Sequence, residues 1–368
     1  MHHGIVPPYL LTRLSNLDRD DLRGAAEAAR RALASEFPHH PSEPSALPTQ
    51  VPKATEPSGP DRTVSDARST ETLPGTVVRH EGDDPTGDQA ADEAYDGLGA
   101  TYAMFAEAFG RASIDGAGLP LLASVHYGRH YDNAFWDGGQ MVFGDGDGQV
   151  FGRFTASLSV IGHELGHGVT QYSANLAYQG QSGALNESVS DVFGALVEQH
   201  ARQQSAPEAS WLIGEGLFTD QVEGNALRSM KEPGTAYDDD VLGKDPQPGH
   251  MDDYVDTADD FGGVHLNSGI PNKAFYLSAT ALGGNAWERA GVIWYETLTG
   301  DLSSTATFDD FATATAKTAS ERFGVGSPEH EAVLDAWSTV GLPIGDTDTD
   351  GQRSPASGRC PHRRAGGA

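Results

Sequence analysis

Cysteine is almost absent from this chain, because Cys360 is the single cysteine among 368 residues. One cysteine cannot form a disulfide within the chain, and this one lies in a tail rich in glycine and arginine. The sequence therefore excludes an intrachain disulfide framework and a metal site built from cysteines. A metal ion bound by this chain needs histidine and carboxylate ligands.

Basic residues are also scarce. The chain has 24 Lys and Arg against 53 Asp and Glu, which gives a formal net charge of −29 and an isoelectric point near 4.6. A strongly negative protein is repelled by the phosphate backbone of DNA and RNA. The charge balance therefore argues against nucleic acid as a partner.

Long apolar runs are missing as well. No stretch approaches the ~18 consecutive apolar residues that a transmembrane helix requires, so we expect no membrane partner. Residues 1–14 contain no apolar segment of signal-peptide length and no small-residue cleavage site after one. We therefore expect a protein that is cytoplasmic, or secreted by a route without a classical signal peptide.

The most informative motif that is present reads H-E-x-x-H, from His163 through Glu164 to His167. Two imidazoles four residues apart lie about 40° apart around a helix, so both can reach one tetrahedral Zn²⁺. The glutamate between them can address a water on that metal. The alternative is a helix with two solvated histidines. A proline-free stretch, 155–173, places its apolar residues at helical spacing on the opposite face, which favours the zinc helix.

A catalytic zinc site usually has three protein ligands and keeps its fourth position open. Glu187 and Asp191 stand four residues apart in a second stretch with helical periodicity. On its own this pattern is typical of a solvated carboxylate face. Beside a zinc helix, it predicts Glu187 as the third ligand and Asp191 as the acceptor of a ring N–H from a ligand histidine.

With these residues the sequence resembles the thermolysin-like zinc metallopeptidases, or gluzincins. Their pattern is H-E-x-x-H followed by N-E-x-x-S-D after about twenty residues, which Asn186 to Asp191 match. Segments 133–136, 141–148, 226–230 and 262–270 resemble further family motifs, in the same order. The resemblance implies an α+β fold of two lobes. A mixed, β-rich N-terminal lobe and a mainly helical C-terminal lobe would flank a cleft with the zinc helix on its floor.

The resemblance also implies a role for each matching residue. His163, His167 and Glu187 would bind one Zn²⁺, with Asn186 and Asp191 behind these ligands. Glu164 would be the general base that accepts a proton from the zinc-bound water and delivers it to the leaving amine. The remaining roles would be stabilisation of the oxyanion by His265 and Tyr178, orientation of His265 by Asp260, and binding of substrate backbone groups by Asn133, Ala134 and Arg228.

The calcium ligands of the family match poorly. Ser159 stands where the family's double-calcium site has an aspartate, Ser210 and Leu212 replace two more carboxylates, and Glu198 and Glu215 remain. We therefore do not expect the double site, and a single calcium ion is the most that these ligands allow. The tail stretch 346–351 begins like a calcium loop, but Ser357 replaces its final glutamate, so we expect a solvated acidic tail.

The N-terminal region predicts a zymogen. Residues 5–11 resemble the short propeptide of the protealysin-like branch of the family, 18–37 have helical periodicity, and 37–70 are rich in Pro and Ser as in a linker. The alternative is a disordered N-terminal arm. The expected division is a propeptide with its linker at 1–66, an N-terminal peptidase lobe with the zinc helix at 67–178, a helical lobe at 179–343 and a disordered tail at 344–368.

The sequence thus predicts a monomeric, zinc-dependent neutral metalloendopeptidase that cleaves proteins or peptides and is inhibited by its own propeptide. A non-catalytic zinc-binding relative that binds a partner is the alternative from another class. Intact Glu164, His265 and zinc ligands favour the enzyme. A zinc hydrolase of non-peptide bonds is a third hypothesis, and the edge-strand motif at 133–136 favours peptide instead.

Overall fold

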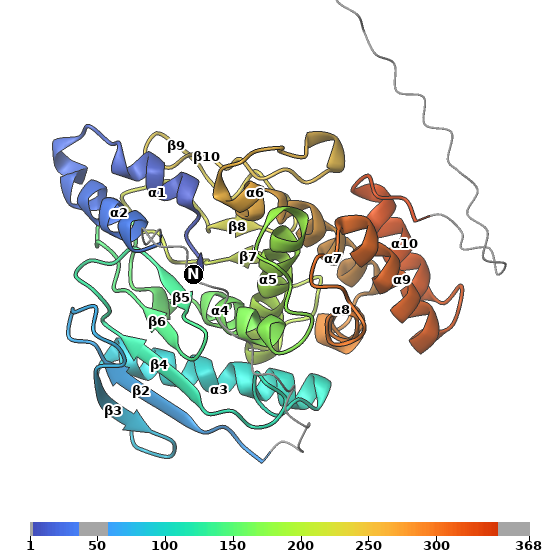
Figure 1. Cartoon of the computed structure of the whole chain (residues 1–368), viewed down its shortest axis with the longest axis horizontal. Coiled ribbons are helices and arrows are strands. Elements are labelled where there is room, and N and C mark those ends of the chain that lie inside the picture. The colour runs from blue at the N-terminus through green and yellow to red at the C-terminus, as the bar shows by residue number, and fades with distance from the viewer. Residues whose placement is uncertain (1–2, 37–57, 345–368) are drawn as a thin grey trace, which may run out of the picture.

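The computed structural model describes residues 3–36 and 58–344. Most of the expected linker and nearly all of the expected tail, with Cys360 and the loop-like stretch 346–351, lie outside the described residues. Figure 1 shows a sheet-containing part at one end of the molecule and a bundle of helices at the other. The fold is α+β, as predicted.

The N-terminal part is built on a mixed six-stranded sheet with the order β1-β5-β6-β4-β2-β3. The pairs β2–β4 and β4–β6 are parallel, and the other pairs are antiparallel. The helix α3 (Gln89–Phe109) packs against this sheet and against the zinc helix. The strands are β1 (His3–Gly4), β2 (Arg62–Asp66), β3 (Thr76–His80), β4 (Leu121–Val125), β5 (Ala134–Trp136) and β6 (Met141–Phe143).

The C-terminal part is mainly helical, and Trp294, Trp337 and Phe311 pack together at its centre. Short strand pairs β7–β8 and β9–β10 lie between its helices. The zinc helix α4 (Leu158–Gln171) contacts α3 and β5 of the N-terminal part as well as α5. The helices of the C-terminal part are α5 (Gly180–Arg202), α6 (Asp260–Asn267), α7 (Gly269–Leu282), α8 (Ala290–Thr299), α9 (Phe308–Phe323) and α10 (Pro328–Thr339). The short strands are β7 (Leu212–Ile213), β8 (Arg228–Ser229), β9 (Asp238–Asp239) and β10 (Gly243–Lys244).

Glycines bring the two helices of the site, α4 and α5, into close contact. A Cβ atom on Gly194 would lie 2.3 Å from the Ser159 carbonyl oxygen, and one on Gly166 would lie 2.9 Å from the Ser190 Cα. Any side chain here would push the helix backbones apart. The H-E-x-x-H segment therefore faces the carboxylates of α5 directly.

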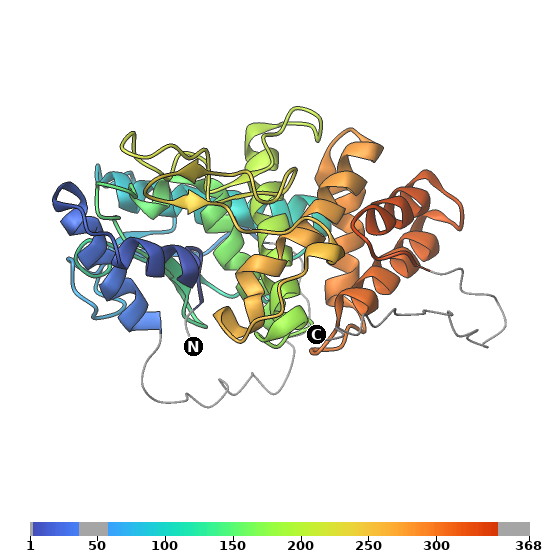
Figure 2. The ribbon, with the colours of Figure 1, turned by 90° about the horizontal axis from the view of Figure 1, so that it is seen from above.

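The N-terminal segment packs against the edge of the sheet nearest to the zinc helix (Figures 1 and 2). Strand β1 pairs antiparallel with β5, with His3 opposite Trp136 and Gly4 opposite Phe135. Two helices follow, α1 (Pro8–Ser15) and α2 (Arg23–Glu36), with a 3-10 turn at Asp20–Leu22 before α2. Three leucines of α1 and three alanines of α2 belong to the main hydrophobic core: Leu10, Leu11, Leu14, Ala25, Ala29 and Ala32.

The structure corrects several predicted boundaries. The linker does not extend to residue 70, because Arg62–Asp66 form β2 between β3 and β4. Residues 286–298 do not form one continuous helix, because Arg289 leaves helical geometry between a 3-10 turn at Ala286–Glu288 and α8. The zinc helix begins at Leu158, after a 3-10 turn at Phe154–Ala156. Side-chain spacing alone does not reveal where backbone angles change.

Within the described residues, no helix is both long and apolar enough to cross a bilayer.

The packing of α4 on α5 predicts that Gly194→Ala lowers the free energy of unfolding by about 1–3 kcal/mol, because the added methyl overlaps the Ser159 carbonyl. Melting temperatures measured by calorimetry test this. Gly139→Ala is the matched control, since its Cβ would meet only a side-chain oxygen of Asp137, at 3.7 Å. Equal melting temperatures for the two variants would contradict the close-packing argument.

Candidate metal centre

Three side chains from α4 and α5 form a compact group of potential metal ligands. The Nε2 atoms of His163 and His167 are 3.1 Å apart, and they lie 3.6 Å and 3.5 Å from carboxylate oxygens of Glu187. A tetrahedral zinc ion with metal–nitrogen distances of about 2.0–2.1 Å separates its ligands by roughly 3.3 Å. All three side chains are buried, and one Glu187 oxygen has no hydrogen-bond partner among the described residues. This donor set fits Zn²⁺.

The second ring nitrogen of each histidine is held by α5. His163 Nδ1 lies 2.7 Å from an Asp191 oxygen, and His167 Nδ1 lies 2.8 Å from the Asn186 side-chain oxygen. These bonds direct both Nε2 atoms toward Glu187. Burial lowers the pKa of each histidine to about 4, so both imidazoles are neutral at pH 7 and able to donate a lone pair to a metal.

Asp191 connects the ligands to the rest of the site. Its carboxylate accepts hydrogen bonds from His163, from Nε and Nη2 of Arg228 at 2.9 and 2.8 Å, and from Asn272 Nδ2 at 2.8 Å. All four side chains are buried. Burial alone would raise the pKa of Asp191, but the charge of Arg228 and the bond to His163 hold it well below its usual value. The carboxylate therefore stays ionised.

Glu164 points into the same buried space. One of its carboxylate oxygens accepts the Trp136 backbone N–H at 2.9 Å, and the other has no partner among the described residues. Burial, and then the negative charge of Glu187, raise the pKa of Glu164 well above its ordinary value. A carboxylate with a raised pKa and one unengaged oxygen is suited to accept and return a proton.

Tyr178 and His265 lie beside Glu187. The Tyr178 hydroxyl donates to Glu187 and lies 3.2 Å from His265 Nε2, and the His265 Nδ1 lies 2.6 Å from Asp260. Burial lowers the pKa of His265, but the carboxylates of Glu187 and Asp260 outweigh this effect and raise it to about 9. A protonated imidazole and a phenol are therefore available to stabilise a developing negative charge.

An unusual backbone brings Asp260 to His265. Residues 260 to 263 all have positive φ, including the non-glycine residues Asp260 and Phe261 at 51°. Such a run is costly and persists only where the surroundings enforce it. It turns the start of α6 so that one Asp260 oxygen accepts the His265 backbone N–H at 2.9 Å and the other faces the ring.

The residues predicted to bind substrate backbone groups contact the N-terminal segment. The Ile5 N–H donates to the Ala134 carbonyl at 3.1 Å, and the Ile5 carbonyl accepts from Arg228 Nη1 at 3.0 Å. The Asn133 side chain accepts from the Val6 N–H at 2.9 Å and donates to the Val6 carbonyl at 3.4 Å. All the backbone donors and acceptors of residues 5 and 6 are therefore engaged at this site.

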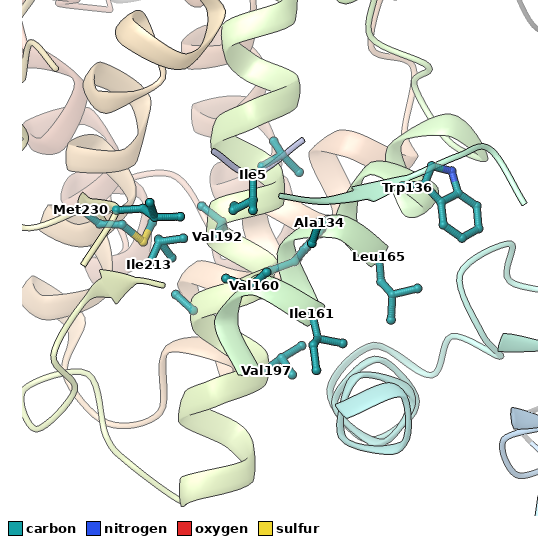
Figure 3. Close-up of a cluster of buried hydrophobic side chains, with 14 of the residues drawn as sticks. Ile5, Ala134, Trp136, Val160, Ile161, Leu165, Val192, Val197, Ile213 and Met230 are labelled. Carbon is teal, nitrogen blue, oxygen red and sulfur yellow. The ribbon is translucent and has the colours of Figure 1, made fainter. Parts of the chain in front are cut away.

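The Ile5 side chain lies in an apolar cluster. Figure 3 shows Ile5 close to the edge strand that carries Ala134, among side chains that include Val192, Ile213 and Met230. All five are buried. The cluster is contributed by β5, α5, β7 and the residue after β8, so that its shape depends on both parts of the molecule.

The positions compared with calcium ligands are occupied by other interactions. Glu198 pairs with Arg202 at 2.7 Å, and the Ser159 hydroxyl accepts the Gly214 N–H at 3.1 Å. Burial raises the pKa of Glu198, with Arg202 and Ser159 acting against the rise. The guanidinium of Arg202 thus lies next to Glu198, a carboxylate that would bind calcium in the double site.

The structure brings every predicted site residue into one region. It also adds residues that the sequence analysis missed: Asn272, which binds Asp191, the backbone N–H of Trp136, which binds Glu164, and Gln247, whose Nε2 donates to the His265 carbonyl at 2.7 Å. Asn272 and Gln247 lie outside the spaced motifs, and a backbone N–H has no sequence signal.

Comparison with known proteins agrees with this geometry. Family models described as the catalytic domain and the alpha-helical domain of thermolysin metallopeptidase match residues 55–171 and 174–342. An extracellular metalloprotease of Pectobacterium carotovorum subsp. carotovorum is 49% identical over 342 residues, 92% of this chain and 96% of that relative. Thermolysin of Alicyclobacillus acidocaldarius subsp. acidocaldarius is 40% identical over 287 residues, 75% of this chain and 50% of that protein.

A solved structure is similar over almost the whole molecule. The precursor of protealysin, a metalloproteinase from Serratia proteamaculans, superposes with a TM-score of 0.84 at 50% sequence identity, covering 92% of this chain and 99% of that one. The buried His-His-Glu group, the neighbouring base and the two matching domains lead to one conclusion. The chain belongs to the thermolysin family of metallopeptidases.

Proposed function

We propose that this zinc metalloendopeptidase is made as a precursor whose N-terminal segment closes its own active site. The observation that carries the proposal is the contact of Ile5 and Val6 with Ala134, Asn133 and Arg228. These are the groups that family resemblance assigns to the backbone of a substrate. A segment that saturates them competes directly with any peptide that must use them.

Zn²⁺ bound by His163, His167 and Glu187 would polarise the scissile carbonyl and lower the pKa of a bound water towards ~7. Glu164 takes the proton of that water on its unengaged oxygen, while the Trp136 N–H holds the other oxygen in place. It then delivers the proton to the departing amine.

The remaining residues orient the substrate and stabilise charge. His265 and Tyr178 donate hydrogen bonds to the oxyanion that forms on the carbonyl, and Asp260 keeps the His265 ring in position. Arg228 holds a backbone carbonyl of the substrate while its other nitrogens remain on Asp191. The apolar cluster around Ile5 would accept a bulky aliphatic side chain of the substrate.

Maturation requires a cut between α2 and β2. Strand β2 lies inside the sheet, and the Arg62 guanidinium binds Glu81 and packs on the Tyr95 ring, 3.7 Å from its centroid. Removal of β2 would open the sheet. The propeptide therefore ends before Arg62, the N-terminal lobe extends from β2 to 178, and the helical lobe from 179 to 343.

The mature enzyme acts as a monomer outside the cell, in line with the extracellular protease named among its relatives. A role as a non-catalytic zinc-binding protein is not favoured, since the base and the metal group are intact.

The role of Glu164 predicts that Glu164→Gln lowers kcat on casein by at least about 100-fold, because the amide cannot accept the proton. The assay uses protein from which an added protease has removed the N-terminal segment, with zinc content measured beside it. A zinc chelator should abolish the activity of the wild type, and the exposed control Glu71→Gln should leave it unchanged. Equal activity of wild type and Glu164→Gln, with and without chelator, would refute the mechanism.

The role of Ile5 predicts that Ile5→Asp activates the uncut chain, because a buried carboxylate in the apolar cluster costs several kcal/mol and releases the segment. Peptidase activity is measured on protein whose intact mass is verified by mass spectrometry. The control Thr12→Asp places the same charge on the exposed side of α1 and should remain inactive. Full activity of the uncut wild type would overturn the inhibitory role.

We expect one zinc ion per chain, bound by His163, His167 and Glu187, and no calcium, because Glu198 is paired with Arg202. Elemental analysis of the purified protein checks the stoichiometry. Since Arg202 already stands beside Glu198, added calcium should leave the melting temperature unchanged. A rise of several degrees in millimolar calcium would show that a calcium site exists despite the substituted ligands.

A further inference from the structure

The peptide bond between Gly4 and Ile5 lies beside the base of the metal centre. The Ile5 N–H donates to the Ala134 carbonyl, and the Trp136 N–H donates to Glu164 Oε2 at 2.9 Å. Backbone groups two residues apart in a strand point to the same edge, so both bonds form on the edge of β5 that pairs with β1. The Glu164 carboxylate therefore lies along the segment next to the Ile5 nitrogen.

Close packing fixes the register of the segment. A Cβ atom on Gly4 would lie 2.3 Å from Asn133 Nδ2, and the Asn133 side chain is itself bound to both backbone groups of Val6. The Ile5 carbonyl accepts from Arg228, and the Ile5 side chain is buried in the apolar cluster (Figure 3). A slip by one residue would turn Ile5 out of this cluster and press a side chain against Asn133.

Ile5 has the surroundings of the residue that follows a cut. Glu164 delivers its proton to a departing amine, and the nitrogen beside it is that of Ile5. The Gly4–Ile5 bond is trans, so the Gly4 carbonyl points the opposite way from the Ile5 N–H, away from β5. The Ile5 N–H also opposes the rise in the pKa of Glu164, as a donor near that carboxylate should.

We propose that the enzyme cuts its own Gly4–Ile5 bond and is then kept inactive by the product, the segment that begins at Ile5. Water adds to the Gly4 carbonyl carbon and the bond to the Ile5 nitrogen breaks. The water oxygen enters the new Gly4 carboxylate, and both water protons end on the Ile5 amine, one of them carried by Glu164. The inference rests on the proposed function, and it makes the segment the first substrate of the site.

The cut leaves the segment attached to the peptidase. The Ile5 carbonyl keeps its bond to Arg228, and Val6 keeps both bonds to Asn133. Further along, Arg13 donates from Nε to the Val241 carbonyl at 2.8 Å and from Nη2 to the Asp240 carbonyl at 2.9 Å. None of these contacts involves a residue before Ile5. The product therefore stays bound, and inhibition continues until the whole segment is removed.

Mass spectrometry of the full-length chain tests the cut. The chain is purified with its metal removed, zinc is added, and the N-terminus is followed over time. We expect a form that begins at Ile5 to accumulate at a rate independent of protein concentration, because bond and base belong to one molecule. Glu164→Gln should form it at least about 100-fold more slowly, since the amide cannot carry the proton. The exposed control Glu71→Gln should match the wild type.

A mixing experiment identifies the molecule that makes the cut. Isotope-labelled Glu164→Gln chain is incubated with unlabelled wild type and zinc. The labelled chain should keep its Gly4–Ile5 bond, because its own fold buries that bond, while the wild type loses the residues before Ile5. The trimmed wild type with an intact linker should remain inactive on casein, as a chain inhibited by its bound product must.

A spectroscopic measurement places the bond without any turnover. In Glu164→Gln labelled with carbonyl-¹³C glycine and ¹⁵N isoleucine, the two Gly–Ile pairs of the sequence, Gly4–Ile5 and Gly269–Ile270, each give one amide–carbonyl cross-peak. Cobalt(II) in place of zinc broadens signals of nuclei close to the metal. The Gly4–Ile5 cross-peak should disappear, and that of Gly269–Ile270, whose glycine packs on Pro233 and Pro248, should remain visible.

Four outcomes overturn the inference: a zinc-loaded wild type that keeps residues 1–4, trimming of labelled Glu164→Gln by the wild type, full casein activity of the trimmed chain, and a Gly4–Ile5 cross-peak that survives cobalt. Failure of the proposed function has different signs. A chain freed of its whole segment that cannot cut casein refutes the peptidase mechanism. Full casein activity before any trimming refutes inhibition by the segment.

Discussion

The carboxylate of Asp191 is the interaction on which the rest of this structure depends. It accepts hydrogen bonds from His163 on the neighbouring helix α4, from Arg228 and from Asn272 on α7. A buried carboxylate is tolerated only with such a set of donors, and each donor is fixed in return. The orientation of His163, the position of Arg228 and the packing of α7 are therefore coupled through one side chain.

That coupling requires two helices to lie unusually close. The glycines at 162, 166 and 194 remove the side chains that would hold α4 and α5 apart, which lets Asp191 and Glu187 reach the histidines. These glycines lower the intrinsic stability of both helices, by roughly 1 kcal/mol each relative to alanine. The burial of the helices in the core compensates for this loss.

The N-terminal segment uses the edge of the sheet as a peptide would. Backbone pairing along β5 gives it a fixed direction, and Ile5 gives it an apolar anchor. The segment is also held through Gln149, which binds the Asp21 carbonyl and the Ala25 N–H at the start of α2. The segment is thus attached both by backbone pairing at the sheet and by side-chain bonds at the start of α2.

The sequence by itself determined the chemistry of the centre. The spacing of His163, Glu164 and His167 and of Glu187 and Asp191 follows from helix periodicity, which is a local property, and the structure brings all five together. The zinc helix was likewise readable to within about three residues, since the proline-free stretch 155–173 contains Leu158–Gln171. Only the tertiary structure decided the short strands β1, β2 and β3, the support of Asp191 by Asn272, and the contacts of Ile5 and Val6 with Ala134, Asn133 and Arg228. Each of these depends on groups far apart in the chain, whose approach is set by the packing of the whole core, and no local periodicity encodes it.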